Sequence, residues 1–309
     1  MDMSKLSGHI WLDNTLVPWE DAKVHVLTHT FHYGLGVFEG VRAYPTQDRG
    51  PCIFRLQAHT DRLFRSAHIV QMKMPFDKDT LNAAQREVVR TNGLQEGYIR
   101  PMCFLGSEAM GIRAEKLSTH VMIAAWAWPS YMTPEARDCG IRVRTSSYTR
   151  HHVNITMCKA KANGNYINSI LALREAIDSG CEEALLLDSE GYVAEGSGEN
   201  FFLVRDNIIY TPDLTSCLEG ITRAAIIQIA QDQGYTVREK RITRDEVYVA
   251  DEAFFTGTAA EVIPIRELDG RAVGNGGRGP VTELLQQIYL EAVRGMQPKY
   301  LHWLTPVED

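Results

Sequence analysis

Two lysines in the middle of the chain stand just before an Asn-Gly turn signal. Lys159 and Lys161 precede Gly164, and a long amphipathic segment follows. The neutral amine of lysine condenses with aldehydes, which requires an ammonium pKa below the ordinary value of about 10.4. A place just before a helix N-terminus lowers that pKa, because the positive end of the peptide dipoles disfavours a second positive charge. Short patterns of this kind more often mark two solvated lysines beside a turn.

An acidic loop at residues 195–200 is the second candidate. It begins with Glu195 and lies between segments 192–195 and 201–204, which alternate like the strands of a meander. Sheet pairing places such a loop deep among strands, where a carboxylate needs a cationic partner. The loop is not a GxSxG nucleophile elbow, because Ala194 replaces the first glycine.

Two further loops have the composition of anion sites. Gly220 precedes a predicted helix that ends at Gly234, and Thr222 adds a hydroxyl on its first turn. The free N–H groups and the dipole of such a helix attract an anion. Without a Walker lysine the loop is not a P-loop. Residues 256–261 form a loop of small and hydroxyl residues between two predicted strands, which also suits an anion. Ordinary tight turns have the same composition.

Two arginines and a Tyr-Arg pair in the N-terminal half offer further charge. Arg62 and Arg65 are one turn apart on a predicted helix. They fit a solvated face, although arginine is also the usual residue for gripping a phosphate. Tyr98 and Arg100 share one face of the predicted strand 98–104. Such a pair can bind a carboxylate, and it is also typical of an edge strand.

The segment near residue 30 resembles two common sites but matches neither. His29 and His32 have a metal-ligand spacing, yet no carboxylate or cysteine cluster accompanies them, so they are predicted to be structural. Gly34, Gly36 and Gly40 give GxGxxxG, which is not the dinucleotide fingerprint, and no strand–loop–helix unit surrounds them. No metal site is therefore predicted.

The composition indicates an ordinary soluble globular protein. Of 309 residues, 44% are hydrophobic and 23% charged, and the net charge is -7. This acidic balance argues against nucleic-acid binding. Neither a signal peptide nor an apolar run of about 18 residues is present, so no membrane attachment is predicted. Six scattered cysteines without a CxxC motif fit free thiols in a reducing cytoplasm.

Periodicity predicts a mixed α+β chain. The helix at 166–179 is expected to carry an apolar stripe formed by Ile167, Ile170, Leu171 and Leu173. Further helices are predicted at 59–67, 78–92, 221–234 and 281–294. Strands are predicted at 8–12, 15–18, 98–104, 121–128, 141–147, 184–187, 192–195, 201–204, 208–210, 253–255 and 262–265.

The segment 132–140 is the candidate connection between two domains. It contains Pro134 and has mixed polarity, as interdomain linkers often do. It would separate a smaller domain at 1–131 from a larger one at 141–309.

Together these groups match the needs of pyridoxal phosphate (PLP). The aldehyde needs a lysine, the phosphate needs N–H groups and hydroxyls, and the protonated pyridine nitrogen needs a carboxylate. The chain resembles the bacterial branched-chain amino-acid aminotransferases of PLP fold type IV. The matching segments keep their order over nearly the whole chain, at 32–34, 37–42, 98–101, 161, 164–166, 195–201, 218–223 and 256–261.

The resemblance implies a role for each matching residue. Lys161 is expected to form the Schiff base and to move the proton between the substrate Cα and the cofactor. The other expected cofactor-binding residues are Glu195 at the pyridine nitrogen, Tyr166 at the ring oxygen, and Arg62, Ile221, Thr222 and Thr258 at the phosphate, with Gly257 beside them. The expected substrate-binding residues are Tyr98, Thr258 and Ala259 at the α-carboxylate, Arg100 at the γ-carboxylate of glutamate, and Tyr33, Phe38, Met110, Trp128 and Tyr131 around the side chain, together with Arg42.

The same resemblance implies an activity, a fold and an assembly. The expected reaction is transamination between Leu, Ile or Val and 2-oxoglutarate, giving branched-chain 2-oxo acids and L-glutamate. The expected fold has a small N-terminal α/β domain and a larger C-terminal domain with a pseudo-barrel sheet. At least a homodimer is expected, and a trimer of dimers is common among bacterial relatives. Asn163 and the pair Leu35-Gly36 depart from the family pattern and leave the substrate range open.

Other functions remain open from the sequence. A fold type IV relative of different specificity, such as a D-amino-acid aminotransferase or aminodeoxychorismate lyase, would share most of these motifs. Residues 98–100 and 38–42 favour the branched-chain type. A non-catalytic PLP carrier is the alternative from another class. Lys159 is not required by the family pattern, and the hypothesis for it is that its charge lowers the pKa of Lys161.

Overall fold

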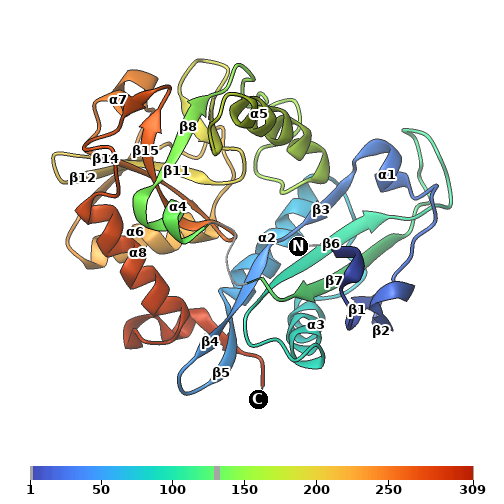
Figure 1. Cartoon of the computed structure of the whole chain (residues 1–309). Helices are drawn as coiled ribbons and strands as arrows, with labels where there is room; N and C mark the ends of the chain where they lie inside the picture. Colours follow the sequence, from blue (N-terminus) through green and yellow to red (C-terminus); the bar gives the residue numbers. More distant parts are fainter. Residues whose placement is uncertain (1–2, 129–132, 309) are drawn as a thin grey trace. The chain divides into compact units, whose positions relative to one another are not determined.

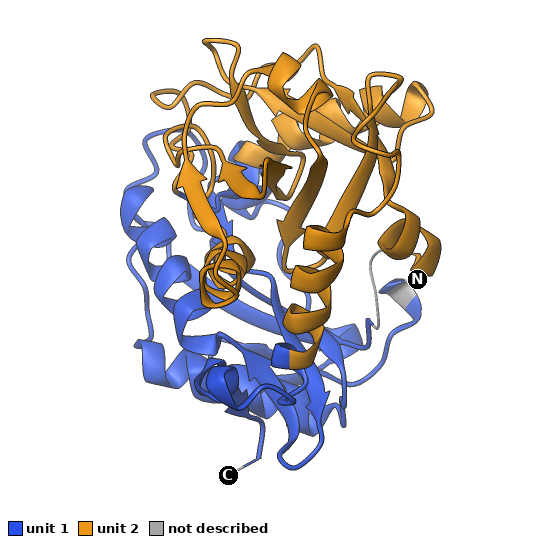
Figure 2. Ribbon diagram, turned by 90° about the vertical axis from the view of Figure 1, so that its left-hand side faces the viewer, with its two compact units in different colours: residues 1–129, 160–164, 292–309 blue, residues 130–159, 165–291 orange. Residues whose placement is uncertain are grey.

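The computed structural model describes residues 3–128 and 133–308 and forms two compact units (Figures 1 and 2). Unit 1 comprises Met1–Pro129, Ala160–Gly164 and Ala292–Asp309. Unit 2 comprises Ser130–Lys159 and Asn165–Glu291. The two units are thus not the two uninterrupted segments predicted from the sequence, because unit 1 includes two short stretches from beyond residue 141.

Strand pairing explains why these two stretches belong to unit 1. Leu304–Pro306 forms a strand that pairs with Gly50–Phe54. Ala162 makes an isolated antiparallel bridge with Val37. The predicted linker also differs: its residues Pro134–Cys139 form a helix of unit 2.

An antiparallel sheet of eight strands forms the frame of unit 1. Its order is β17-β5-β4-β6-β7-β1-β2, with β3 also paired to β6. The predicted hairpin before residue 20 is confirmed as β1 and β2. The strands are β1 (His9–Leu12), β2 (Thr15–Pro18), β3 (Gly36–Phe38), β4 (Val41–Thr46), β5 (Gly50–Phe54), β6 (Gly97–Leu105), β7 (Thr119–Trp126) and β17 (Leu304–Pro306), and the helices are α1 (His29–Tyr33), α2 (Leu56–Ile69) and α3 (Lys78–Thr91).

The two faces of the unit 1 sheet differ in chemistry. Ile99 and Cys103 of β6 lie in a buried core together with Leu63 of α2 and Val88 of α3. Because side chains alternate along a strand, Tyr98 and Arg100 belong to the opposite face. Tyr98 and Arg100, which were predicted to share one face of the strand, therefore lie on the face that is turned away from the helix-covered core.

A nine-stranded sheet forms unit 2, with the order β10-β9-β8-β15-β14-β11-β12-β13 and β16 paired to β15. The strands are β8 (Ile141–Thr145), β9 (Glu183–Leu187), β10 (Val193–Gly196), β11 (Asn200–Arg205), β12 (Ile208–Thr211), β13 (Thr236–Glu239), β14 (Glu252–Gly257), β15 (Glu261–Leu268) and β16 (Arg271–Ala272). The helices are α4 (Pro134–Cys139), α5 (Tyr166–Asp178), α6 (Ile221–Asp232), α7 (Arg244–Tyr248) and α8 (Pro280–Val293).

The connection from β10 to β11 corrects the predicted meander. β9 pairs with β10 and β11 pairs with β12, as expected, but β11 pairs on its other side with β14. A turn of three residues, 197–199, still joins β10 to β11. In the sheet order, β10 and β11 are separated by β9, β8, β15 and β14. A turn of three residues can join them only if the sheet curls, as in the predicted pseudo-barrel.

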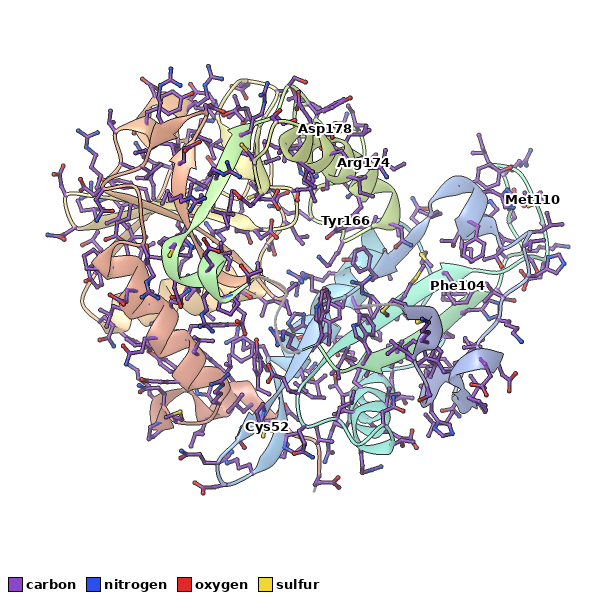
Figure 3. All side chains as sticks on the ribbon, in the orientation of Figure 1. Cys52, Phe104, Met110, Tyr166, Arg174 and Asp178 are labelled. Carbon is purple, nitrogen blue, oxygen red and sulfur yellow. The ribbon has the colours of Figure 1, made fainter. Side chains whose placement is uncertain are left out.

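The predicted apolar stripe of α5 does not face the core. Ile167 is 65% exposed, and Ile170 and Leu171 are also exposed. The buried face instead contains Ala172 and Ala176, which pack with β9. Small residues let the helix approach the sheet closely, so side-chain size overrides hydrophobicity here. Figure 3 shows α5 with Tyr166, Arg174 and Asp178 along its length.

Among the described helices, none is both long and apolar enough to cross a membrane.

Candidate active site

The backbone of Lys161 is fixed in unit 1 by a strand and a helix. Phe38 of β3 donates its N–H to the Lys161 carbonyl at 3.0 Å, and the Lys161 N–H donates to Ser66 Oγ of α2 at 3.0 Å. The Nζ atom lies 5.0 Å from the centre of the Phe38 ring. The amine therefore stands beside an aromatic ring while its backbone has little freedom.

Four of the predicted substrate-binding residues are brought together on the same side of unit 1. The guanidinium carbon of Arg100 lies 4.6 Å from the Phe38 ring centre, and Arg100 Nη2 donates to Tyr98 Oη at 3.1 Å. The Trp128 ring lies 5.0 Å from the Tyr98 ring. This group combines aromatic walls with a cation and a hydroxyl, which suits both apolar and carboxylate-bearing side chains.

Arg42 and Gly40 support this group from β4 and the residue before it. Arg42 lies opposite Tyr98 in the β4–β6 register. It is buried, and its Nη2 donates to the Trp128 carbonyl at 3.0 Å and to Glu96 at 2.8 Å. A Cβ atom at residue 40 would collide with the Tyr98 hydroxyl, so only glycine permits this approach. Arg42 therefore supports the pocket by holding the backbone of Trp128 and by pairing with Glu96.

Tyr33 and Met110 lie together on a different part of unit 1. Both side chains are exposed, and Gly111 N donates to Tyr33 Oη at 3.1 Å. Met110 lies on the loop that follows β6 (Figure 3). Nearby His29 pairs through Nε2 with the Gly111 carbonyl, so its ring has a structural hydrogen bond. The remaining predicted pocket residue, Tyr131, lies outside the described residues.

Arg62 forms a buried ion pair with Glu39. Nε and Nη2 of Arg62 donate to the two carboxylate oxygens of Glu39 at 2.6 and 2.9 Å. His59 Nδ1 lies 2.7 Å from the same carboxylate. Burial by itself raises the pKa of Glu39, but Arg62 and His59 hold that pKa well below its ordinary value. Glu39 thus fixes the guanidinium that was predicted to hold the phosphate.

Glu39→Gln is expected to lower the free energy of unfolding by about 3 kcal/mol at pH 7, because it leaves the Arg62 charge buried without a counter-charge. A carboxylate with a depressed pKa contributes stability above its unfolded value of 4.5, and this contribution is lost as the pH falls. The difference between wild type and variant should therefore shrink below about pH 4.5. Urea unfolding across this pH range measures it, and a difference that does not depend on pH would contradict the account.

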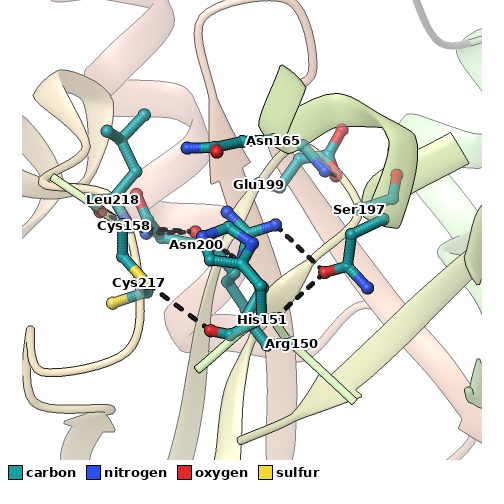
Figure 4. Close-up of polar contacts among 12 residues, drawn as sticks. Arg150, His151, Cys158, Asn165, Ser197, Glu199, Asn200, Cys217 and Leu218 are labelled. Carbon is teal, nitrogen blue, oxygen red and sulfur yellow. Dashed lines mark hydrogen bonds and ion pairs between the residues drawn. The ribbon is translucent and has the colours of Figure 1, made fainter. Parts of the chain in front are cut away.

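Glu195 is held in unit 2 by Arg150, Asn200 and Leu218, three residues that are labelled in Figure 4. Its Oε1 lies 2.8 Å from Arg150 Nε as an ion pair. Its Oε2 accepts from Leu218 N at 3.2 Å and weakly from Asn200 Nδ2 at 3.5 Å. Both Arg150 and Glu195 are buried. The Arg150 N–H does not point along the ion pair, so Oε1 accepts no hydrogen bond within the described part of the chain.

The loop between β12 and α6 ends in a helix N-terminus without a side-chain cap. Gly220 is the N-cap residue, and Ile221 and Thr222 follow it as the buried first turn. Asn200 Nδ2 donates to the Leu218 carbonyl at 2.9 Å. The Asn200 amide leaves no room for a Cβ atom at residue 220. The uncapped N–H groups of a twelve-residue helix make this a favourable anion site.

The remaining predicted residues of unit 2 lie at the ends of secondary-structure elements. Gly257 ends β14, and Thr258 and Ala259 form the turn to β15. All three are partly exposed, as a loop that receives an anion must be. Tyr166 is the first residue of α5 and is also partly exposed.

Two buried carboxyl groups without a cationic partner in the described part of the chain belong to β9 and to the turn that follows β10. Glu183 and Glu199 are both buried, and no arginine or lysine pairs with them among the described residues. Glu183 Oε1 accepts from Ala184 N at 2.7 Å and from Ser197 N at 3.2 Å, and Glu199 Oε2 accepts from Gly198 N at 3.0 Å. Burial, followed by the charge of Glu183, raises the pKa of Glu199 well above its ordinary value. Burial also raises the pKa of Glu183, and Glu199, whose pKa is raised well above the ordinary value, is the carboxyl group of the pair that favours the protonated form.

Glu199→Gln is expected to preserve the fold and to make stability less sensitive to rising pH, because an amide replaces the protonated carboxyl. A carboxyl with a raised folded pKa contributes stability below its unfolded value of 4.5, and the contribution is lost as the pH rises toward the folded value. The free energy of unfolding of the wild type should thus fall relative to the variant above about pH 4.5. Thermal unfolding over this range measures the effect, and parallel curves would argue that Glu199 is ionised.

Sequence reasoning missed Arg150 and Glu39. The buried acidic loop was predicted to need a cation, but nothing in the sequence distinguishes Arg150, which lies far before Glu195 in the chain, from other arginines. Glu39 occurs within a matching motif, yet its partner Arg62 comes from α2. Only the tertiary structure joins such pairs.

Comparison with known proteins identifies the family. The model of the amino-transferase class IV family matches residues 36–268. The chain belongs to the class IV aminotransferases. The branched-chain-amino-acid aminotransferase of Pseudomonas aeruginosa is 61% identical over 308 residues and covers 100% of both chains, and that of Salmonella typhimurium is 44% identical over 99% of both.

Solved structures of other aminotransferases match nearly the whole chain and agree with this family assignment. A T.th. branched-chain amino acid aminotransferase, solved with pyridoxamine 5'-phosphate, is 50% identical with a TM-score of 0.96 and covers 98% of this chain and 99% of its own. The Escherichia coli branched-chain amino acid aminotransferase is 43% identical with a TM-score of 0.95, covering 98% and 100%. The predicted family and fold type are thus confirmed.

The residues of this class IV aminotransferase fit PLP, the cofactor of the family. Oε1 of Glu195 is buried and accepts no hydrogen bond within the described chain, so it can accept one from a protonated pyridine nitrogen. The uncapped N-terminus of α6 offers N–H groups to a phosphate. In unit 1, Lys161 supplies an amine beside Phe38. Each unit therefore has groups of the chemistry that the cofactor requires.

Proposed function

We propose that the protein transfers amino groups between branched-chain L-amino acids and 2-oxoglutarate with PLP as cofactor. The observation that carries this proposal is the grouping of Lys161, Phe38, Arg100 and Tyr98 on one side of unit 1. Relatives named branched-chain aminotransferases, matched over their full length, support the substrate class. The products would be branched-chain 2-oxo acids and L-glutamate.

Each residue has a distinct task in this proposal. PLP, when bound, would supply the electron sink that transamination requires. Lys161 would hold the cofactor through its amine and would move a proton at the substrate Cα. Glu195, oriented by Arg150, keeps the pyridine nitrogen protonated. The first turn of α6 binds the phosphate, with Arg62 and Thr258 as further proposed ligands.

One pocket must accept two chemically different side chains. Phe38 and Trp128 receive Leu, Ile or Val by apolar burial, and at about 0.8 kcal/mol per methylene the pocket discriminates weakly among them. Arg100 offers a charge to the γ-carboxylate of glutamate. Its guanidinium also stacks over Phe38, so it is already oriented before glutamate arrives. Tyr33 and Met110, which lie on another part of unit 1, and Tyr131 remain predicted contacts of the substrate side chain.

A scan of half-reactions followed by cofactor absorbance tests the proposal. L-leucine, L-isoleucine, L-valine and L-glutamate should each convert the holoenzyme, whereas D-alanine should not. Conversion by D-alanine alone would favour the D-amino-acid aminotransferase alternative. A yellow protein that converts with no amino acid would favour a PLP carrier.

We also propose that the protein is a homo-oligomer of the cytoplasm, at least a dimer and with a trimer of dimers as the larger form. Large apolar side chains are exposed, including Val26, Phe31 and Ile112 in unit 1 and Ile167 in unit 2. A second copy of the chain would remove such side chains from water. The six free cysteines suit a reducing compartment. Light scattering of the purified protein distinguishes these assemblies from a monomer.

A further inference from the structure

The side chain of Lys159 is engaged with a loop of unit 2. Its Nζ donates to the Leu214 carbonyl and, at 3.2 Å, to the Cys217 carbonyl. Glu219 Oε1 lies 4.0 Å away. All these partners belong to the loop between β12 and α6, which the chain reaches only about 55 residues later. One ammonium group thus binds two carbonyls inside the 212–220 loop and lies 4.0 Å from Glu219 near its end.

The loop that Lys159 binds carries the anion site. It ends at Gly220, the N-cap of α6, and so sets the direction of the first N–H groups of that helix. Its last part is also bound by Asn200, through the Leu218 carbonyl, and by Glu195, through the Leu218 N–H. Any shift of residues 214–217 would therefore be transmitted to the N-terminus of α6.

We propose that Lys159 is a positioning residue for phosphate binding: it holds the 212–220 loop so that the N-terminus of α6 is preformed for the phosphate of the cofactor. This rests on the proposed function, because it assigns the phosphate to that helix. Lys159 orders the loop by donating to two of its backbone carbonyls, and its positive charge offsets that of the Glu219 carboxylate near the proposed phosphate.

This role differs from the hypothesis that Lys159 lowers the pKa of Lys161. The ammonium of Lys159 is engaged by two carbonyls and lies near Glu219 in the 212–220 loop. Loss of Lys159 should then weaken binding of the phosphate and leave the titration of the Lys161–cofactor bond unchanged. The pKa hypothesis predicts the reverse pattern.

The test compares PLP with pyridoxal, which has the same ring and aldehyde but no phosphate. In the full-length Lys159→Met variant, the affinity for PLP should fall about tenfold, equal to about 1.4 kcal/mol, and that for pyridoxal should not change. Lys159→Arg keeps the charge and the donors and should restore most of the affinity for PLP. Lys240→Met is the matched control, since Lys240 is 39% exposed against 37% for Lys159 and also forms an ion pair in unit 2.

Three results would overturn the proposal. Equal loss of PLP and pyridoxal affinity would place the effect of Lys159 at the ring or at Lys161. Unchanged PLP affinity in a folded Lys159→Met would show that the loop holds its shape without the lysine. A raised pH midpoint of the absorbance band of the bound cofactor, with unchanged phosphate binding, would support the pKa hypothesis. A wild-type protein that binds neither compound would instead refute the proposed function.

Discussion

Lys161→Ala is expected to abolish transamination, with a loss of at least about 10⁴-fold in kcat, because the variant lacks both the amine that bonds the cofactor and the group that moves the substrate proton. The backbone contacts of residue 161 with Phe38 and Ser66 use no side-chain atoms of Lys161. The fold should therefore survive. Single-turnover assays with L-leucine measure the effect.

Borohydride reduction of the holoenzyme, followed by peptide mapping, supplies the direct readout. The cofactor should be trapped on Lys161 in the wild type and in Lys159→Met, and should not be trapped in Lys161→Ala. Trapping on Lys159 in the Lys161→Ala variant, with activity retained, would reverse the assignment of the two lysines.

Glu195→Gln is expected to lower kcat/KM by about 10²- to 10³-fold, since a neutral amide does not keep the pyridine nitrogen protonated. The same change leaves Arg150 buried without its counter-charge, so the free energy of unfolding should fall by about 3–5 kcal/mol. Both quantities can be measured on one preparation, by steady-state kinetics and by urea unfolding.

Arg150→Met separates the two effects of Glu195→Gln. The double variant Arg150→Met/Glu195→Gln removes both charges and should regain stability relative to Glu195→Gln, while its activity stays low. Arg150→Met alone should retain the carboxylate but lose its orientation, giving an intermediate loss of activity. Wild-type kcat/KM in Glu195→Gln would show that the carboxylate does not serve the cofactor.

The local elements were largely predictable from the sequence because they depend on short-range patterns. The alternation of 98–104 and the apolar run of 121–128 predicted two strands, which are confirmed as β6 and β7. The position of Gly220 before a periodic segment predicted the N-terminus of α6. The α5 stripe was wrong because periodicity reports which face is apolar, and the sheet beneath α5 selects small residues instead.

The sequence by itself determined the chemistry that this protein has available: an amine, an acidic loop, two anion loops and a Tyr-Arg pair, in an order that matches one family. The tertiary structure decided which partner each group has. Arg150 forms an ion pair with Glu195, and Glu39 forms one with Arg62. The ammonium of Lys159 donates to the loop before α6. The physical reason is that charges pair by distance in space, and strand pairing brings together residues that the sequence separates.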